Sequence, residues 1–369
     1  MTKKSSHRKP SLPTALGYRM PAEWEPHEST WLAWPHFRND WPGKFEPIPW
    51  VYAEIVRNLA RHERVDLIVN SELLEKRARA VLEKADALSD NVRFHRWRTD
   101  RVWTRDSGCI FLTPSDVEKD TSALALHFQF NAWAKYSNYK HDEKVGKRMA
   151  KAAGARVLHP KSGKHRVVLE GGSIDVNGKG LLLTTEECLL STTQQRNPPM
   201  DRVVYEQMFT DYFGVQTVIW LGEGIAGDDT HGHVDDITRF VAPNTVVTMV
   251  EPNAQDENYS ALQLNLGRLR AARNAEGHKL DVIELPMPRP VIFESRRLPA
   301  SYANFYIANG AVLVPVFDDP NDRVALNTLA ELFPTREIIP IYSGDLIWGF
   351  GALHCMTQQQ PVVSSVSSQ

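Results

Sequence analysis

The chain has 369 residues, of which 42% are hydrophobic and 24% charged, and its formal net charge is -2. This composition supplies a sizeable apolar core and excludes an intrinsically disordered chain, a collagen and a coiled coil. The near-neutral charge gives no electrostatic basis for nucleic acid as the main partner, and no apolar run reaches the roughly 18–20 residues of a membrane helix. We therefore expect a globular protein that binds neither nucleic acid nor a membrane.

The two ends of the chain differ from its middle. Residues 1–17 begin basic and polar with no hydrophobic stretch behind them, which predicts a flexible tail and no secretory signal. Residues 362–369 continue a Gln/Ser/Val-rich end and are expected to be a second flexible tail. No Gly/Ser linker divides 18–361, which we take as one domain. The three cysteines are too few for a disulfide framework and favour a reduced, cytoplasmic location.

Helical and strand patterns alternate along the domain. Apolar residues at helical spacing predict helices near 50–62, 72–88, 143–153, 202–213, 258–272 and 322–333. Short β-rich runs predict strands at 65–69, 124–130, 167–169, 181–183, 218–221, 246–250, 311–314 and 338–341. The later helices start roughly 56–64 residues apart, with two or three strands between them. This suggests about five β-β-α-β units, although an ordinary α/β sheet with antiparallel additions fits the same pattern.

Two polar groups stand at the ends of predicted strands. Asp106 follows Trp103 and Arg105 just before an apolar run, and Glu170 is followed by two glycines. Each could hold a cation, or be a turn carboxylate that pairs with a neighbour or with water. Two glycines allow a close backbone approach.

A denser group spans residues 227–236, where two histidines and four acids fall within nine residues. His231, His233 and Asp235 with their acidic neighbours would suit a zinc or manganese site. A histidine acting as general base beside a cation-binding aspartate is the other functional interpretation. Asp106, Glu170 and His233 are separated by 64 and 63 residues, which matches the helix period. If every unit delivers one strand end to a common centre, these three groups meet there.

Cys355 is a candidate nucleophile because a glycine-rich approach precedes this late cysteine and histidines occur elsewhere in the chain. An inert buried thiol is the alternative, and we expect it for Cys109 and Cys188. Cys109 lies in an apolar run, and the acids before Cys188 would raise a thiol pKa and so reduce its reactivity.

One cysteine, one histidine and several carboxylates around one centre define a chemistry. The carboxylates repel one another unless a cation lies between them, and a planar guanidinium pairs with carboxylates in a bidentate manner. A thiolate could then attack the guanidinium carbon, while the histidine protonates departing ammonia and later activates water. The intermediate would be an S-alkylthiouronium and the product a urea.

At this point the chain resembles a known family, the agmatine deiminase and bacterial peptidylarginine deiminase-like family of the guanidine-modifying (pentein) superfamily. The resemblance covers about 18–361. It is carried by residues 19–27 and 31–35, Trp103-x-Arg105-Asp106-x-Gly108, 130–133, 169–173, 183–189, Asp229-Thr230-x-Gly232-His233-Val234-Asp235 and His354-Cys355-x-Thr357-Gln358-Gln359-Gln360-Pro361.

The resemblance implies a fold, a five-bladed α/β propeller of ββαβ units with pseudo-fivefold symmetry. It also implies a role for each matching residue. Cys355 matches the nucleophile and His233 the general acid/base, while Glu170 matches the acid that orients them. Asp106 and Asp235 match the carboxylates that hold the guanidinium. The family chemistry uses no metal and no cofactor. Trp103 or Trp133 could stack on a cationic substrate, or be core aromatics.

Agmatine is the substrate that we expect, with N-carbamoylputrescine and ammonia as products that feed putrescine biosynthesis. Asp228 and Asp229 favour a substrate with an amine. The same chemistry on free or peptidyl arginine is the near alternative. A metal-dependent hydrolase built on His231, His233 and Asp235, and a non-catalytic propeller used for binding, are the alternatives of other classes. The expected partner is a small-molecule guanidine, and a homo-oligomer stays open.

Overall fold

The computed structural model describes residues 12–115 and 123–363. The expected tails fall largely outside these residues, at 1–11 and 364–369. In the described part of the first tail, the short helix η1 (Thr14–Leu16) lies beside a later helix, where the Thr14 hydroxyl donates to the carbonyl of Asp211 at 2.9 Å. The division into one domain and two tails stays a prediction.

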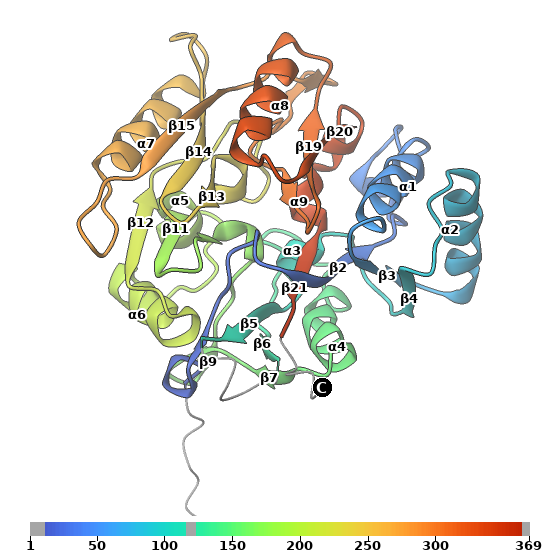
Figure 1. The fold of residues 1–369 in the computed structure, drawn as a ribbon, viewed down its shortest axis with the longest axis horizontal. Helices are drawn as coiled ribbons and strands as arrows, with labels where there is room; N and C mark the ends of the chain where they lie inside the picture. Colours follow the sequence, from blue (N-terminus) through green and yellow to red (C-terminus); the bar gives the residue numbers. More distant parts are fainter. Residues whose placement is uncertain (1–11, 116–122, 364–369) are drawn as a thin grey trace, which may run out of the picture.

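The described residues form a mixed α/β fold of five separate sheets and two short hairpins (Figure 1). The sheets are β1 (Tyr18–Arg19) with β5 (Ile110–Pro114), β6 (Leu124–Leu126) and β7 (Arg156–Leu158); β10 (Asp175–Val176) with β11 (Leu181–Thr185) and β12 (Thr217–Leu221); β13 (Thr238–Ala242) with β14 (Thr245–Val250) and β15 (Asp281–Pro286); β18 (Tyr306–Ile307) with β19 (Ala311–Val316) and β20 (Glu337–Tyr342); and β21 (Gln358–Pro361) with β2 (His27–Ala33), β3 (Arg64–Val69) and β4 (Val92–Arg96). The hairpins are β8 (Lys161–Ser162) with β9 (His165–Arg166), and β16 (Ile292–Phe293) with β17 (Arg296–Arg297).

The five sheets share one arrangement, an antiparallel pair followed by a parallel pair, such as β13 against β14 and then β14 beside β15. Parallel neighbours need a crossover, and a helix supplies it. The crossover helices are α1 (Ile48–Leu59) and α2 (Glu72–Lys84), α4 (Val145–Ala152), α5 (Glu186–Leu190) with α6 (Arg202–Phe213), α7 (Tyr259–Ala271) and α8 (Pro320–Leu332).

The six helices expected from periodicity are confirmed to within a few residues at their ends. In α1, Ile48, Tyr52, Ile55 and Leu59 recur at helical spacing and are fully buried, whereas Trp50 on another face is half-exposed. The strand expected at 167–169 is wrong, apart from one bridge between Gln129 and Val168. The side chain of Asn197 bonds both the N–H and the carbonyl of Val168, and so takes the place of a neighbouring strand.

Short helical turns lie at the ends of strands that start a sheet, and α3 and α9 lie near the middle of Figure 1. The turns are α3 (Thr104–Ser107) before β5, η4 (Gly171–Ser173) before β10, η5 (Val234–Asp236) before β13, and α9 (Leu353–Met356) before β21. α3 contacts both α9 and η4, and η4 contacts η5. Strand ends that are far apart in the sequence therefore meet at one centre.

Within the described ranges, no helix is both long and apolar enough to cross a membrane.

Candidate active site

A cavity of about 580 Å³ lies over the central turns, and four of the predicted site residues line it: Trp103, Asp106, Trp133 and Cys355. The other three, Glu170, His233 and Asp235, are fully buried next to them. The strand ends that the spacing was expected to bring together do meet.

Cys355 lies in α9, and its Sγ accepts a hydrogen bond from Nδ2 of Asn304 at 3.1 Å. Asp235 Oδ2 lies 3.9 Å from the same sulfur. Burial raises the pKa of Cys355 well above its usual value, and the carboxylates of Asp235, Asp236 and Asp106 raise it further. Without a cation in the site, Cys355 is therefore a thiol.

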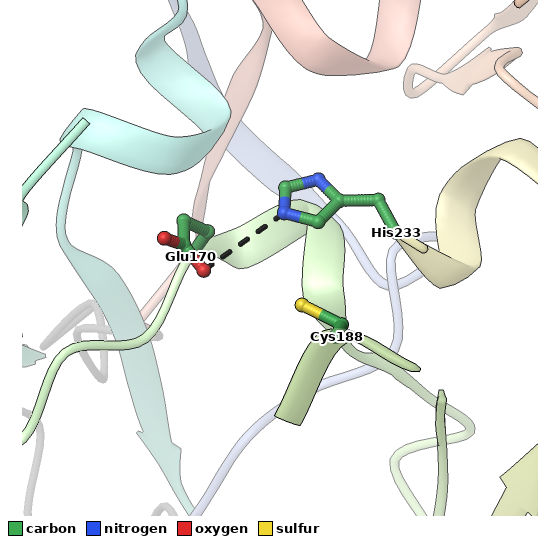
Figure 2. Close-up of side chains that lie close together, drawn as sticks. All are labelled: Glu170, Cys188 and His233. Atoms are coloured by element: carbon green, nitrogen blue, oxygen red, sulfur yellow. Dashed lines mark ion pairs between the residues drawn. The ribbon is translucent and has the colours of Figure 1, made fainter. Parts of the chain in front are cut away.

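His233 stands among three carboxylates. Its Nδ1 lies 3.9 Å from Asp106 Oδ2 and 4.0 Å from Asp235 Oδ1, and its Nε2 lies 3.9 Å from Glu170 Oε2 (Figure 2). Burial alone would lower the pKa of His233, but Asp106, Cys188 and Glu170 together raise it well above its usual value. The ring is therefore a cation that can release a proton.

Gly172 allows this cluster to form. A Cβ at Gly172 would lie 2.5 Å from His233 Nδ1, 2.9 Å from Asp235 Oδ2 and 3.1 Å from Asp106 Oδ1. The backbone N–H of Gly172 also donates to Asp106 Oδ1 at 3.1 Å. The glycine pair after Glu170 thus serves a close backbone approach.

Asp106 keeps its charge near the cavity. The indole N–H of Trp133 donates to Asp106 Oδ2 at 2.8 Å. Burial raises the pKa of Asp106 to about 6, with Asp235 and Glu170 adding to the effect while His233 opposes it. Asp106 is therefore largely ionised at neutral pH, and ready to accept from a cationic donor.

Glu170 is fixed by Arg196, whose Nε donates to Glu170 Oε1 at 3.1 Å. Burial by itself would raise the pKa of Glu170, but Arg196 and His233 outweigh it and lower the pKa to about 2. Glu170 therefore stays ionised. Its Oε2, the oxygen nearer His233, has no hydrogen-bond partner among the described residues.

Asp235 is held by His354, the residue before the candidate nucleophile. His354 Nδ1 lies 2.6 Å from Asp235 Oδ2, and its Nε2 lies 2.8 Å from Glu23 Oε2. Glu23 in turn accepts from Arg239 at 2.9 Å and from Arg105 at 3.1 Å. A buried ionic network thus fixes the orientation of a carboxylate that faces Cys355.

The comparisons with known proteins agree with this geometry. The sequence profile of Porphyromonas-type peptidyl-arginine deiminases matches residues 19–361. The chain belongs to this family. Agmatine deiminase of Pseudomonas aeruginosa (strain UCBPP-PA14) is 35% identical, with 95% of this chain and 97% of that one covered.

Two solved structures of the family are similar in fold. Agmatine deiminase of Enterococcus faecalis superposes with a TM-score of 0.87 at 29% identity, covering 96% of this chain and 98% of that one. A cysteine-to-serine variant of C. jejuni agmatine deiminase, described with its substrate bound, superposes with a TM-score of 0.81 at 30% identity, covering 93% and 96%.

The residues of the metal-site alternative are not assembled in this member of the family. His231 Nδ1 lies 3.3 Å from Glu187 Oε1 and its Nε2 lies 3.2 Å from Ser191 Oγ. Among the described residues, His231 belongs to neither of the two clusters whose ligand atoms lie close enough for a metal ion. The metal-dependent hydrolase built on His231, His233 and Asp235 is not favoured.

The two acids expected to favour an amine are occupied. Asp228 accepts from the backbone N–H groups of Thr230, Gly232 and His233, and so holds the loop in shape. Asp229 lines the cavity, but it accepts from Lys135 Nζ and from the Tyr136 hydroxyl, each at 2.5 Å.

Asp40 is the acid in this part of the cavity that sequence reasoning missed. It lines the cavity and pairs with Arg101 through Oδ1, while its buried Oδ2 has no hydrogen-bond partner among the described residues. Burial raises the pKa of Asp40 to about 7, with Asp229 adding to the effect and Arg101 opposing it.

Proposed function

We propose that the chain is a cysteine-dependent agmatine deiminase, which converts agmatine and water to N-carbamoylputrescine and ammonia. The observation that carries this proposal is the geometry at Cys355, a thiol at the floor of a cavity with carboxylates and an imidazole around it. The names of the relatives, which match over nearly their full length, support agmatine as the substrate.

In the proposed complex, Asp106 and Asp235 accept from the guanidinium N–H groups of the substrate. The bound cation offsets the carboxylates that raise the pKa of Cys355, so the thiol ionises only when substrate is present. Trp103 and Trp133 line the same cavity and would cover the guanidinium and its alkyl chain.

The chemistry then runs in two halves. The Cys355 sulfur bonds to the guanidinium carbon, and the carbon–nitrogen bond to one terminal NH2 breaks. His233 donates a proton to that group, which leaves as ammonia, and the thiol proton balances the donation. In the second half His233 takes a proton from water, the oxygen adds to the thiouronium carbon, and the carbon–sulfur bond breaks. The products are a urea, the restored thiol and one proton.

Glu170 acts as a positioning residue for His233 in this scheme. Its charge is maintained by Arg196, and its free Oε2 lies on the Nε2 side of the ring. None of the steps draws on a metal or a cofactor, because nucleophile, acid/base and cation-binding groups are all side chains of this chain.

The choice of agmatine over arginine rests on Asp40. Agmatine ends in an ammonium group, and the free Oδ2 of Asp40 is a buried acceptor on the cavity wall. Arg296 also lines the cavity, but one of its nitrogens lies 3.7 Å from Asp229 Oδ1. A substrate that carries a carboxylate would compete with Asp229 for Arg296.

The finer fold and the setting are part of the same proposal. The five sheets with one shared strand arrangement support a five-bladed propeller of ββαβ units with pseudo-fivefold symmetry. The three cysteines are free, and a catalytic thiol requires a reducing compartment, which supports the cytoplasm. The product is one hydrolysis away from putrescine. The oligomeric state stays open.

Ammonia release from agmatine, arginine and an arginyl peptide tests the proposal, each with and without EDTA and with a Cys355→Ala control. We expect release from agmatine alone, unaffected by EDTA and lost in the variant. Release that survives in the variant would overturn the cysteine mechanism. Release from arginine but not from agmatine would overturn the substrate.

A further inference from the structure

Cys188 is a buried thiol that the proposed chemistry does not use. It lies in α5, is 1% exposed, and faces His233 and Glu170 (Figure 2). One ligand atom from each of the three side chains, a sulfur, an imidazole nitrogen and a carboxylate oxygen, lies within 4.8 Å of the other two. The two acids before Cys188 are engaged elsewhere, because Glu186 pairs with Arg202 and Arg268, and Glu187 with His231.

The ligand atoms have free valences. Glu170 Oε2 and both ring nitrogens of His233 are buried without a hydrogen-bond partner among the described residues. Arg196 binds only the other carboxylate oxygen of Glu170, at 3.1 Å. A carboxylate held through one oxygen by an outer partner, with the second oxygen free, is the arrangement found around metal ligands.

The donor set and its dimensions select the kind of ion. Thiolate, imidazole and carboxylate together suit Zn²⁺, whereas Mg²⁺ and Ca²⁺ prefer oxygen alone. Zinc bonds of about 2.0–2.3 Å in a tetrahedron place ligand atoms roughly 3.3–3.8 Å apart. His233 Nε2 and Glu170 Oε2 lie 3.9 Å apart, so this pair needs almost no movement.

We propose that Glu170, Cys188 and His233 form an inhibitory Zn²⁺ site within the active site. A bound ion would take the lone pair of His233 and the free oxygen of Glu170, and its charge would exclude the guanidinium. Zinc would therefore stop turnover, the opposite of the metal requirement of a metallohydrolase. The inhibition goes beyond the deiminase function and is measured against it.

The second cluster with metal-ligand spacing, Asp235, Asp236 and Cys355, is less suited to the ion. Cys355 Sγ and Asp236 Oδ1 both accept from Asn304, and His354 occupies Asp235 Oδ2. This cluster also lacks an imidazole. Its hydrogen bonds would have to break before zinc could bind.

The first experiment measures inhibition of ammonia release by ZnCl2 in the wild type, Cys188→Ala and Cys109→Ala. Cys109 is an equally buried cysteine that belongs to neither cluster. We expect EDTA-reversible inhibition of the wild type and Cys109→Ala at similar zinc concentrations, and at least a tenfold higher concentration for Cys188→Ala. Equal inhibition of all three proteins, or none of the wild type, overturns the proposal.

The second experiment needs no turnover, so it is independent of the substrate and of any activity lost in Cys188→Ala. Co²⁺ is titrated into Cys355→Ala, and into Cys188→Ala/Cys355→Ala, after circular dichroism has shown that both are folded. Cys188→Ser replaces the alanine variant if that one does not fold. We expect a thiolate-to-cobalt absorption band in Cys355→Ala that the double variant lacks. A band absent from Cys355→Ala but present in Cys188→Ala would place the metal on Cys355 and overturn the proposal.

Discussion

The imidazole of His354 lies with its Nδ1 2.6 Å from Oδ2 of Asp235, directly beside the candidate nucleophile. The other ring nitrogen faces Glu23 at 2.8 Å, so the ring links a buried ionic network to a carboxylate of the site. His354 touches no substrate in the proposed complex. We infer that it positions Asp235 for the guanidinium.

His354→Gln should therefore raise the KM for agmatine by about tenfold, with a smaller effect on kcat, because a buried carboxylate loses its partner. His27→Gln is the matched control. His27 is also buried, and pairs with Glu63 at 3.2 Å away from Cys355. Steady-state kinetics of both folded variants make the test. Equal changes in KM would show that His354 is merely structural.

Gly172→Ala should lower kcat/KM by about 100-fold or more. The added Cβ would meet His233, Asp235 and Asp106, and displacements near 1 Å in a catalytic cluster have effects of this size. Gly267→Ala, in α7 with nothing within 4 Å of its Cβ, should leave activity unchanged. A fully active Gly172→Ala would contradict the close approach.

Cys355 should react slowly with a neutral electrophile, because its pKa is raised by burial and by Asp235, Asp236 and Asp106. The rate with iodoacetamide should keep rising as the pH increases above the usual range of thiols, since only the thiolate reacts. Chloroacetamidine, whose positive charge offsets the carboxylates, should react at least tenfold faster at neutral pH. Peptide mapping identifies the modified cysteine. A fast iodoacetamide rate that is already constant below pH 7 would show a preformed thiolate.

Asp40→Asn should weaken agmatine selectively. The loss of a charged hydrogen bond predicts a fall of about 10- to 100-fold in kcat/KM for agmatine, but little change for butylguanidine, which has no terminal amine. The raised pKa of Asp40, about 7, means that the free acid binds a proton below this pH. Wild-type kcat/KM for agmatine should therefore fall as the pH decreases through about 7, and the variant should lack this step. Equal losses on both substrates would contradict an amine site.

The sequence predicted the helices and the convergence of strand ends because both depend on local patterns. The 64 residues between Asp106 and Glu170 repeat the spacing of the units, and the structure brings both residues to one centre. Asn304 was missed although it follows Asp235 by 69 residues, on nearly the same period. Alignment of a fifth unit on that period would have found it.

Other contacts left no local signal. Glu23 and His354 are 331 positions apart, and their contact depends on how the first and last segments pack. Asp40 precedes a tryptophan in a segment without periodicity, and only the cavity shows that one of its oxygens is free. The acids Asp228 and Asp229 were misinterpreted because their partners, backbone N–H groups and Lys135 with Tyr136, depend on loop geometry that spacing does not reveal.

The most direct test of the account is mass spectrometry of the wild-type protein, quenched with acid during turnover of agmatine and digested to peptides. The account predicts an adduct of agmatine less ammonia on the peptide that contains Cys355, and none on those with Cys109 or Cys188. Continued ammonia release without any adduct on Cys355, or an adduct on Cys188 instead, would contradict it.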